Sequence, residues 1–188
     1  MALNRQALVE AVVDGAAVFN PPGLPIALRD WSLPIDQLGE GAHYYKHDPA
    51  EARRLLAQAG YPRGFATVVD FHSFGETALV DGTQLLATDL KEIGIEAKLN
   101  QREYGAYIAT VPLGKYEGIV WGPATPFLEP DSFLATAYLP DSPRNNMKVN
   151  DPPLTDMLLR QRRVQDPAKR RELILEIQRY LAKMVYRA

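Results

Sequence analysis

The hydrophobic positions along the chain follow two periods, and their alternation predicts an α/β fold. Apolar residues recur every three to four positions in the helical segments and form unbroken or alternating runs in the strands. A strand, a helix and a second strand in succession indicate a crossover with parallel pairing. Predicted helices begin near Asn4, Asp48, Asp81, Tyr104, Pro130, Asp151 and Asp166, and predicted strands cover 67–71, 95–100 and 118–121.

Local residue chemistry marks the starts of several of these helices. Asp48, Asp151 and Asp166 each precede a proline. Aspartate caps the first turn, and proline suits the first helical position because its missing N–H would have no partner there. Asp81 and Gln84 have the spacing of a capping box, which predicts that the third helix begins at Asp81.

Residues 20–41 are rich in proline and glycine and interrupt the periodic pattern. The composition predicts a long ordered loop laid over the surface. Loops of this length are often functional or belong to a larger assembly. A plain connector is the alternative, and the sequence leaves both interpretations open.

The segment 116–134 contains the main candidate for a functional site. Residues 118–121 are apolar without interruption, as in a central strand covered on both faces. A proline-broken loop follows, and open α/β sheets bind ligands beyond the carboxyl ends of their strands. The loop has no nucleophile beside a base, so it predicts binding and not catalysis. The candidate ligand-binding residues are Trp121, Gly122, Phe127 and Glu129.

Composition narrows the classes of function. The 188 residues are 46% hydrophobic and carry a formal net charge of −2, which gives no reason to expect nucleic acid or an anionic membrane as a partner. The basic residues in 160–171 form a cluster that is interleaved with acids, as on a solvated helical face; these acids are Asp156, Asp166, Glu172 and Glu176. The chain has no cysteine and no glycine-rich phosphate loop, so we expect no cofactor.

Targeting and membrane signals are also lacking in the sequence as given. No apolar run is long enough to span a bilayer, and the first residues do not resemble a signal peptide. Both ends fall in or beside helical sequence. We therefore expect that the chain is a piece of a longer protein and that this piece is not inserted in a membrane.

Two residue groups could carry other chemistry. His43 and His47 are four positions apart, but Asp48 caps the helix after them, so they lack the shared helical face that a metal site would use. Asp70, His72 and Ser73 lie together on a strand and its exit. Because no nucleophile elbow of the G-x-S-x-G type surrounds Ser73, chance adjacency is the better interpretation.

Several strings resemble the family 5 extracellular solute-binding proteins, which are the oligopeptide, dipeptide, nickel and oligosaccharide receptors of ABC importers. These strings are ALNRQAL at 2–8, YKHDP at 45–49, AGYPRGF at 59–65 and LKEIGI at 90–95. The resemblance covers essentially the whole chain. It implies a lobe of the type II periplasmic-binding-protein fold, with a mixed, mostly parallel sheet flanked by helices.

The resemblance also implies an organisation and a function. Residues 1–188 would form most of the second lobe of a two-lobed receptor, without the first lobe and the returning tail. The receptor would lie in the periplasm or at the cell surface. It would capture a peptide, a modified peptide or an oligosaccharide between its lobes without a covalent step, and deliver it to the transmembrane subunits of an ABC permease.

The binding loop matches the family pattern in part. Trp121 matches a tryptophan that ends the strand, with Val120 in place of a glycine, and Glu129 opens an acid-Pro-x-x-Phe-Leu pattern. Peptide-binding members have an aspartate three residues before that acid, and it pairs with the α-ammonium of the ligand. Pro126 stands at this position and offers no charge, which favours a neutral, sugar-like or modified-peptide ligand.

Two other classes of function remain open from the sequence. The same fold occurs as the ligand-sensing domain of some transcription regulators, which would have a DNA-binding segment upstream. A small α/β hydrolase would use Ser73 as its nucleophile, and replacement of Ser73 by alanine would then abolish esterase activity.

Overall fold

The computed structural model describes residues 1–18, 24–74, 76–122 and 127–187. The chain divides into two compact units. The first comprises Met1–Phe19, Lys46–Val111 and Lys115–Ala124. The second comprises Asn20–Tyr45, Pro112–Gly114 and Thr125–Ala188.

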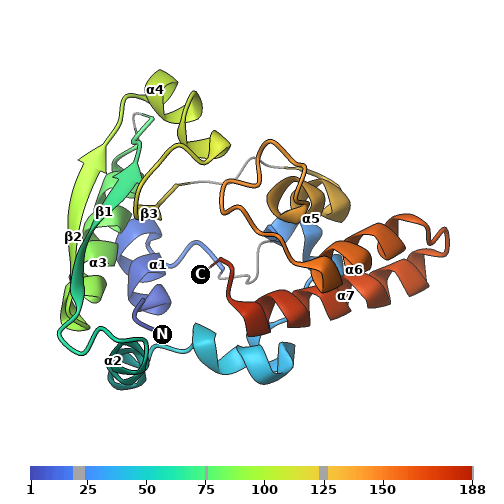
Figure 1. Ribbon diagram of the computed structural model, residues 1–188, viewed down its shortest axis with the longest axis horizontal. Coiled ribbons are helices and arrows are strands. Elements are labelled where there is room, and N and C mark those ends of the chain that lie inside the picture. The colour runs from blue at the N-terminus through green and yellow to red at the C-terminus, as the bar shows by residue number, and fades with distance from the viewer. Residues whose placement is uncertain (19–23, 75, 123–126, 188) are drawn as a thin grey trace. The chain divides into compact units, whose positions relative to one another are not determined.

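A parallel sheet forms the centre of the first unit. Its strands are β1 (Phe65–Phe71), β2 (Ile95–Gln101) and β3 (Ile119–Val120), in the order β2-β1-β3. Both strand pairs are parallel, as the sequence predicts. Helix α3 (Thr77–Glu92) connects β1 to β2 and packs against the sheet (Figure 1). This arrangement confirms the α/β fold.

The prediction that residues 118–121 form a central strand is wrong for the part of the chain that the structure describes. β1 is central, and β3 lies at the edge with only two residues, both half-buried. Gly118 has a φ of +76°, and a Cβ there would lie 2.4 Å from the carbonyl oxygen of Val68. The chain therefore enters the sheet through a turn that only glycine fits, and regular pairing begins at Ile119.

Two helices of the first unit differ from the sequence prediction. α1 (Arg5–Val13) and α2 (Pro49–Gln58) lie where the pattern predicts. α3 begins at Thr77, one turn before Asp81, because the amide of Glu76 already donates to the carbonyl of Ser73 (2.8 Å) and starts the turn. The helix predicted to begin near Tyr104 is α4 (Tyr104–Ile108), which is only five residues long and is followed by a 3-10 turn (Val111–Leu113).

The AGYPRGF string has a structural explanation. Gly60 ends the turn after α2 with a φ of +92°, a conformation that favours glycine. Gly64 has a φ of +70°, and a Cβ on it would lie 1.7 Å from the carbonyl oxygen of Gly94. The segments that lead into β1 and β2 therefore meet backbone to backbone, which leaves no room for a side chain. The hydrophobic core of this unit includes the buried residues Ala52, Val69, Leu86, Leu90, Ile93 and Ile95.

The second unit is helical in the residues described. It contains α5 (Pro130–Tyr138), α6 (Pro152–Arg162) and α7 (Pro167–Met184). The side chains of Glu129, Asp151 and Asp166 accept hydrogen bonds from the first turns of these helices, as the helix-start signals indicate. α6 and α7 pack side by side (Figure 1). Fully buried residues of the core include Leu134, Leu154, Leu158, Ile174, Ile177 and Leu181.

The segment predicted to be a surface loop contributes to the core of the second unit. Its described part forms 3-10 helices at Ile26–Trp31, Ile35–Gln37 and Gly39–Tyr45. It is ordered, as expected, but four of its leucines are buried. The buried amide of Gln178 on α7 joins the segment to the helix by accepting from the amide N–H of Leu33 (3.1 Å). These leucines are Leu24, Leu28, Leu33 and Leu38.

Candidate ligand-binding site

Trp121 lies at the carboxyl end of β3 and is half-buried. Its indole packs against the core of the first unit, and a Cβ on Gly82 of α3 would lie 3.7 Å from the ring. Its backbone N–H donates to the carbonyl of Asp70 on β1 (3.0 Å). The indole is therefore held at the edge of the sheet by packing and by the backbone, with part of its surface exposed.

Gly122 follows directly and is exposed. A Cβ at this position would lie 3.0 Å from the hydroxyl oxygen of Tyr107 and 3.8 Å from Nε2 of His72. The backbone thus passes close to two polar side chains, and any larger residue would press on the tyrosine.

A buried ion pair lies under this exit. Asp70 is 1% exposed. Its carboxylate accepts from the Asn100 amide (Nδ2–Oδ1, 2.6 Å) and from the Arg102 guanidinium (Nη2–Oδ2, 2.6 Å). Nη1 of Arg102 donates to the hydroxyl of Thr110 (3.1 Å). The hydrogen bond to Asp70 raises the pKa of Arg102, so the guanidinium stays charged. This pair connects β1, β2 and the residues after α4.

Arg102 also lines a pocket of about 440 Å³ at the carboxyl ends of β1 and β2. Phe74 and Tyr104 form its aromatic wall, with ring centroids 4.3 Å apart. Phe74 is 62% exposed and has a φ of +45°, a strained conformation for a bulky residue. The sequence analysis did not predict this pocket. Its remaining lining residues are Ser73, Gln101 and Glu103.

His72 is buried beside this pocket. Its ring lies 4.4 Å from that of Tyr107 and 5.1 Å from that of Tyr104, and its Nδ1 has no hydrogen-bond partner within the described ranges. Burial lowers the pKa of His72, and the charge of Glu76 opposes this effect in part. The described contacts include no hydrogen bond from His72 to Asp70 or Ser73. The Ser73 hydroxyl accepts instead from Gln101 (3.1 Å).

Phe127 and Glu129 belong to the second unit, whereas Trp121 and Gly122 belong to the first. Phe127 is half-buried and packs edge to face against Phe133 of α5, with ring centroids 5.1 Å apart. Pro126, which the sequence pattern predicts to stand in place of an ammonium-binding aspartate, lies outside the described residues.

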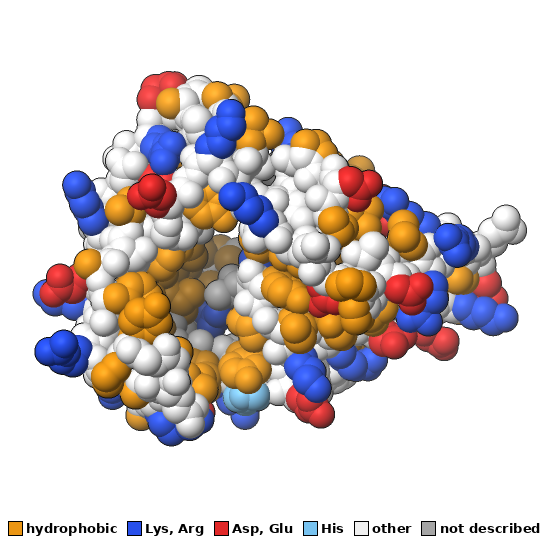
Figure 2. All heavy atoms as spheres, viewed as in Figure 1, with side chains coloured by type: hydrophobic (Ala, Val, Ile, Leu, Met, Phe, Trp, Pro, Cys, Tyr) orange, Lys and Arg blue, Asp and Glu red, His pale blue; other side chains and the backbone are white. Residues whose placement is uncertain are grey.

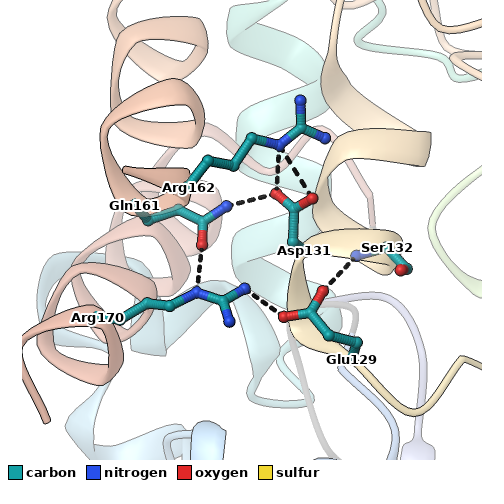
Figure 3. Close-up of polar contacts among 6 residues, drawn as sticks. All are labelled: Glu129, Asp131, Ser132, Gln161, Arg162 and Arg170. Carbon is teal, nitrogen blue, oxygen red and sulfur yellow. Dashed lines mark hydrogen bonds and ion pairs between the residues drawn. The ribbon is translucent and has the colours of Figure 1, made fainter. Parts of the chain in front are cut away.

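Glu129 takes part in an ion-pair network at the start of α5 (Figure 3). Its carboxylate accepts from the N–H of Ser132 (3.1 Å) and from the guanidinium of Arg170. The side-chain amide of Gln161, which is fully buried, accepts from Arg170 (2.9 Å) and donates to Asp131. The sequence analysis identified Glu129 but missed Arg170, which is 41 residues away along the chain.

The histidines and the charged helical residues considered in the sequence analysis make contacts with nearby residues. His43 lies in a 3-10 helix, with its Nδ1 2.7 Å from the carbonyl oxygen of Glu40. No cluster of three or more His, Cys, Asp or Glu side chains suited to a metal ion occurs in the described ranges. Acidic and basic side chains alternate over α6 and α7 (Figure 2), and Arg160 pairs with Asp156 at 3.0 Å. Among the helices described, none is long and apolar enough to cross a membrane.

Comparison with known proteins identifies the family. Residues 1–145 match the family described as bacterial extracellular solute-binding proteins, family 5 Middle. The chain belongs to this family. Family 5 members are transport-associated binding proteins and not enzymes.

Relatives and solved structures agree with this assignment. A dipeptide-binding protein of Pseudomonas aeruginosa is 31% identical over 98% of this chain and 34% of its own length. The periplasmic binding protein DppA of Helicobacter pylori, solved in complex with the peptide STSA, is 26% identical with a TM-score of 0.79 over 98% of this chain and 35% of its own. A Thermotoga maritima protein with bound mannohexaose is 20% identical, with a TM-score of 0.83 over 98% of this chain and 38% of its own.

These comparisons support the type II periplasmic-binding-protein fold. The family 5 chain described here spans about a third of the length of the relatives that it matches.

Proposed function

We propose that this chain is most of the second lobe of a two-lobed solute-binding protein that captures a peptide-like solute and delivers it to an ABC permease. The observation that carries the proposal is the family 5 match over residues 1–145, together with a dipeptide-binding relative that is 31% identical over 98% of the chain. The two lobes close over the ligand by a hinge motion, and the periplasm is the site of capture.

The proposed ligand contacts lie at the exit of β3 and at the start of α5. Trp121 offers part of an indole face, and Gly122 leaves the backbone open to close approach. Phe127 adds a second aromatic face, and Glu129 a partly exposed carboxylate. Aromatic faces with few polar groups are typical of small-molecule binding sites.

A peptide is a better-supported ligand than an oligosaccharide. The peptide complex belongs to a relative that is 26% identical, whereas the mannohexaose complex belongs to a protein at 20% identity, where the similarity concerns the fold. The exposed pair of Phe74 and Tyr104 on the pocket of the first unit suits an apolar side chain of a peptide.

Native mass spectrometry of the full-length protein tests this proposal. The protein is incubated with an equimolar tripeptide library and, separately, with a mixture of maltooligosaccharides and mannooligosaccharides. We expect retention of peptides, and at least tenfold weaker retention after Trp121→Ala. Leu159→Ala, at an exposed position on α6, is the matched control and leaves retention unchanged. Retention of sugars alone, or of neither class, contradicts the proposal.

A further inference from the structure

The pocket at the carboxyl ends of β1 and β2 lies entirely within the first unit. Residues 73–74, which follow β1, form one side, and residues 101–104, at the end of β2 and the start of α4, form the other (Figure 1). Its volume of about 440 Å³ is at the lower end of the range for small-molecule sites. One long side chain of a ligand is therefore a suitable occupant.

Two exposed aromatic rings form one wall of this pocket. Phe74 is 62% exposed and Tyr104 is 40% exposed, and their ring centroids are 4.3 Å apart. Phe74 keeps a φ of +45° although it is bulky. A strained backbone at an exposed aromatic residue costs stability, which points to a role in binding. Such rings accept the methylenes of a ligand side chain, and their π electrons attract a cation.

The arginine of the pocket is already neutralised. Nη2 of Arg102 donates to the carboxylate of Asp70 (2.6 Å), and Nη1 donates to the hydroxyl of Thr110 (3.1 Å). The Asp70 carboxylate is 1% exposed, so withdrawal of Arg102 would leave a buried charge without its partner. Arg102 is therefore not available to pair with an anionic ligand.

Glu103 supplies the uncompensated charge. It is exposed, and its Oε2 accepts from the N–H of Ala106 (2.9 Å). Hydrogen bonds from the backbone of Gly105 and Ala106 lower the pKa of its carboxyl group, which keeps it ionised at neutral pH. No basic side chain pairs with Glu103 among the residues that the structure describes. Because a carboxylate has about four acceptor sites, Glu103 can cap α4 and accept from a ligand together.

We propose that this pocket is a subsite for a basic side chain of a bound peptide, with Glu103 as its specificity-determining residue. The methylene stem of an arginine or lysine side chain lies along Phe74 and Tyr104, and its charged end reaches Glu103. This inference rests on the proposed peptide capture and deepens it, because it names the side chain that the first unit selects. An acidic side chain would meet the charge of Glu103 with no free cation to offset the repulsion.

Isothermal titration calorimetry on the full-length protein tests the inference. The probes are alanine tripeptides in which one position carries arginine, citrulline, lysine, norleucine or glutamate, and each position is tested in turn. Citrulline and norleucine keep the approximate length of the basic side chains without their charge. The readout is the ratio of the dissociation constants of the neutral and the basic peptide.

Four variants assign this ratio to the pocket. Glu103→Gln removes the charge and keeps a side-chain oxygen that can accept from Ala106. Glu103→Asp keeps the charge, and Tyr104→Leu removes one aromatic face. Glu96→Gln is the matched control, since it removes one negative charge from an exposed position on β2 outside the pocket.

At one position of the tripeptide, we expect arginine to bind about tenfold more tightly than citrulline, because an exposed ion pair and a cation–π contact act together. Lysine and norleucine should differ in the same direction. Glu103→Gln and Tyr104→Leu should each reduce the ratio about threefold. Glu103→Asp should retain most of it, and Glu96→Gln all of it. The variants at two different pocket residues keep the test decisive if one of them fails to fold.

Equal binding of the basic and neutral forms at every position, or tighter binding of the glutamate peptides, overturns the inference while peptide capture stands. A ratio that Glu103→Gln leaves unchanged, or that Glu96→Gln lowers equally, also overturns it, since the preference then has another source. Absence of binding by every tripeptide removes the proposed peptide capture as well. The failure of the inference and the failure of the function are therefore distinguishable.

Discussion

The two units pair acids with arginines in different ways. In the first unit Asp70, whose carboxylate is 1% exposed, pairs with Arg102, whose side chain is 25% exposed. In the second unit Glu129 and Asp131 belong to a network with Arg170 and Arg162 that solvent reaches. A buried charge has no alternative partner when its own is removed, whereas a solvated charge is stabilised by water. We therefore expect a larger loss of stability when the first pair is broken than when a pair of the second network is broken.

The chain offers a direct way to compare the units, because it contains two tryptophans, one in each. Trp31→Phe leaves Trp121 as the fluorescent reporter of the first unit. Trp121→Phe leaves Trp31 as the reporter of the second. Urea unfolding in these two backgrounds measures the free energy of unfolding of each unit.

The largest expected effect follows from Arg102→Met. This change leaves the carboxylate of Asp70, which is 1% exposed, without its cation, and breaking a buried pair in this way costs about 3–5 kcal/mol. Urea unfolding followed by Trp121 fluorescence measures the loss. Arg160→Met, which removes an exposed pair with Asp156 in the second unit and is followed through Trp31 fluorescence, is the control and costs less than about 1 kcal/mol. Similar losses for the two variants would remove the contrast between the units.

A smaller loss is expected from Gln161→Leu in the second unit. The side chain is fully buried, and its replacement removes hydrogen bonds to Asp131 and Arg170 while it retains the volume. We expect about 1–3 kcal/mol, measured through Trp31 fluorescence. Gln165→Leu, at an exposed position in the same unit, is the matched control. A loss as large as that of Arg102→Met would show that the network also governs stability.

Glu129→Ala is expected to cost about 1 kcal/mol, because it removes the N-cap of α5 and one partly exposed ion pair. The same Trp31 reporter measures it. Part of this cost should disappear at high salt, since solvent-exposed charge pairs are screened. Glu129→Gln, which keeps hydrogen-bonding capacity without the charge, should cost less. If Glu129→Ala and Glu129→Gln cost the same and salt changes neither value, the whole effect comes from the loss of the N-cap.

The smallest effect concerns pH in the first unit. Burial lowers the pKa of His72 below its ordinary value of 6.5, so folding favours the neutral form. This contribution to stability is complete above pH 6.5 and decreases as pH falls through 6.5 towards the lowered pKa. We expect the urea midpoint reported by Trp121 to fall from pH 7.5 to pH 5. His72→Gln should flatten this dependence, and an unchanged slope would show that another group titrates.

Local features of the fold could be predicted from the sequence because their causes lie within a few residues. The caps Asp48, Asp151 and Asp166 bond to amides two or three positions away, and each helix begins where these residues indicate. Gly60 ends its helix for an equally local reason. The motif strings likewise predicted the family, which the match over residues 1–145 confirms.

The tertiary structure decided the features that depend on distant partners. Which strand is central depends on strand order, and the sequence pattern does not contain that order. An uninterrupted apolar run such as residues 118–121 can form a central strand or a covered edge strand. Asp70 and Arg102 are 32 residues apart, and Glu129 and Arg170 are 41 apart. No periodic signal connects residues at such separations. The sequence by itself determined which acids and arginines are present, and only folding decided which of them neutralise one another, because Coulomb attraction depends on distance in space and not along the chain.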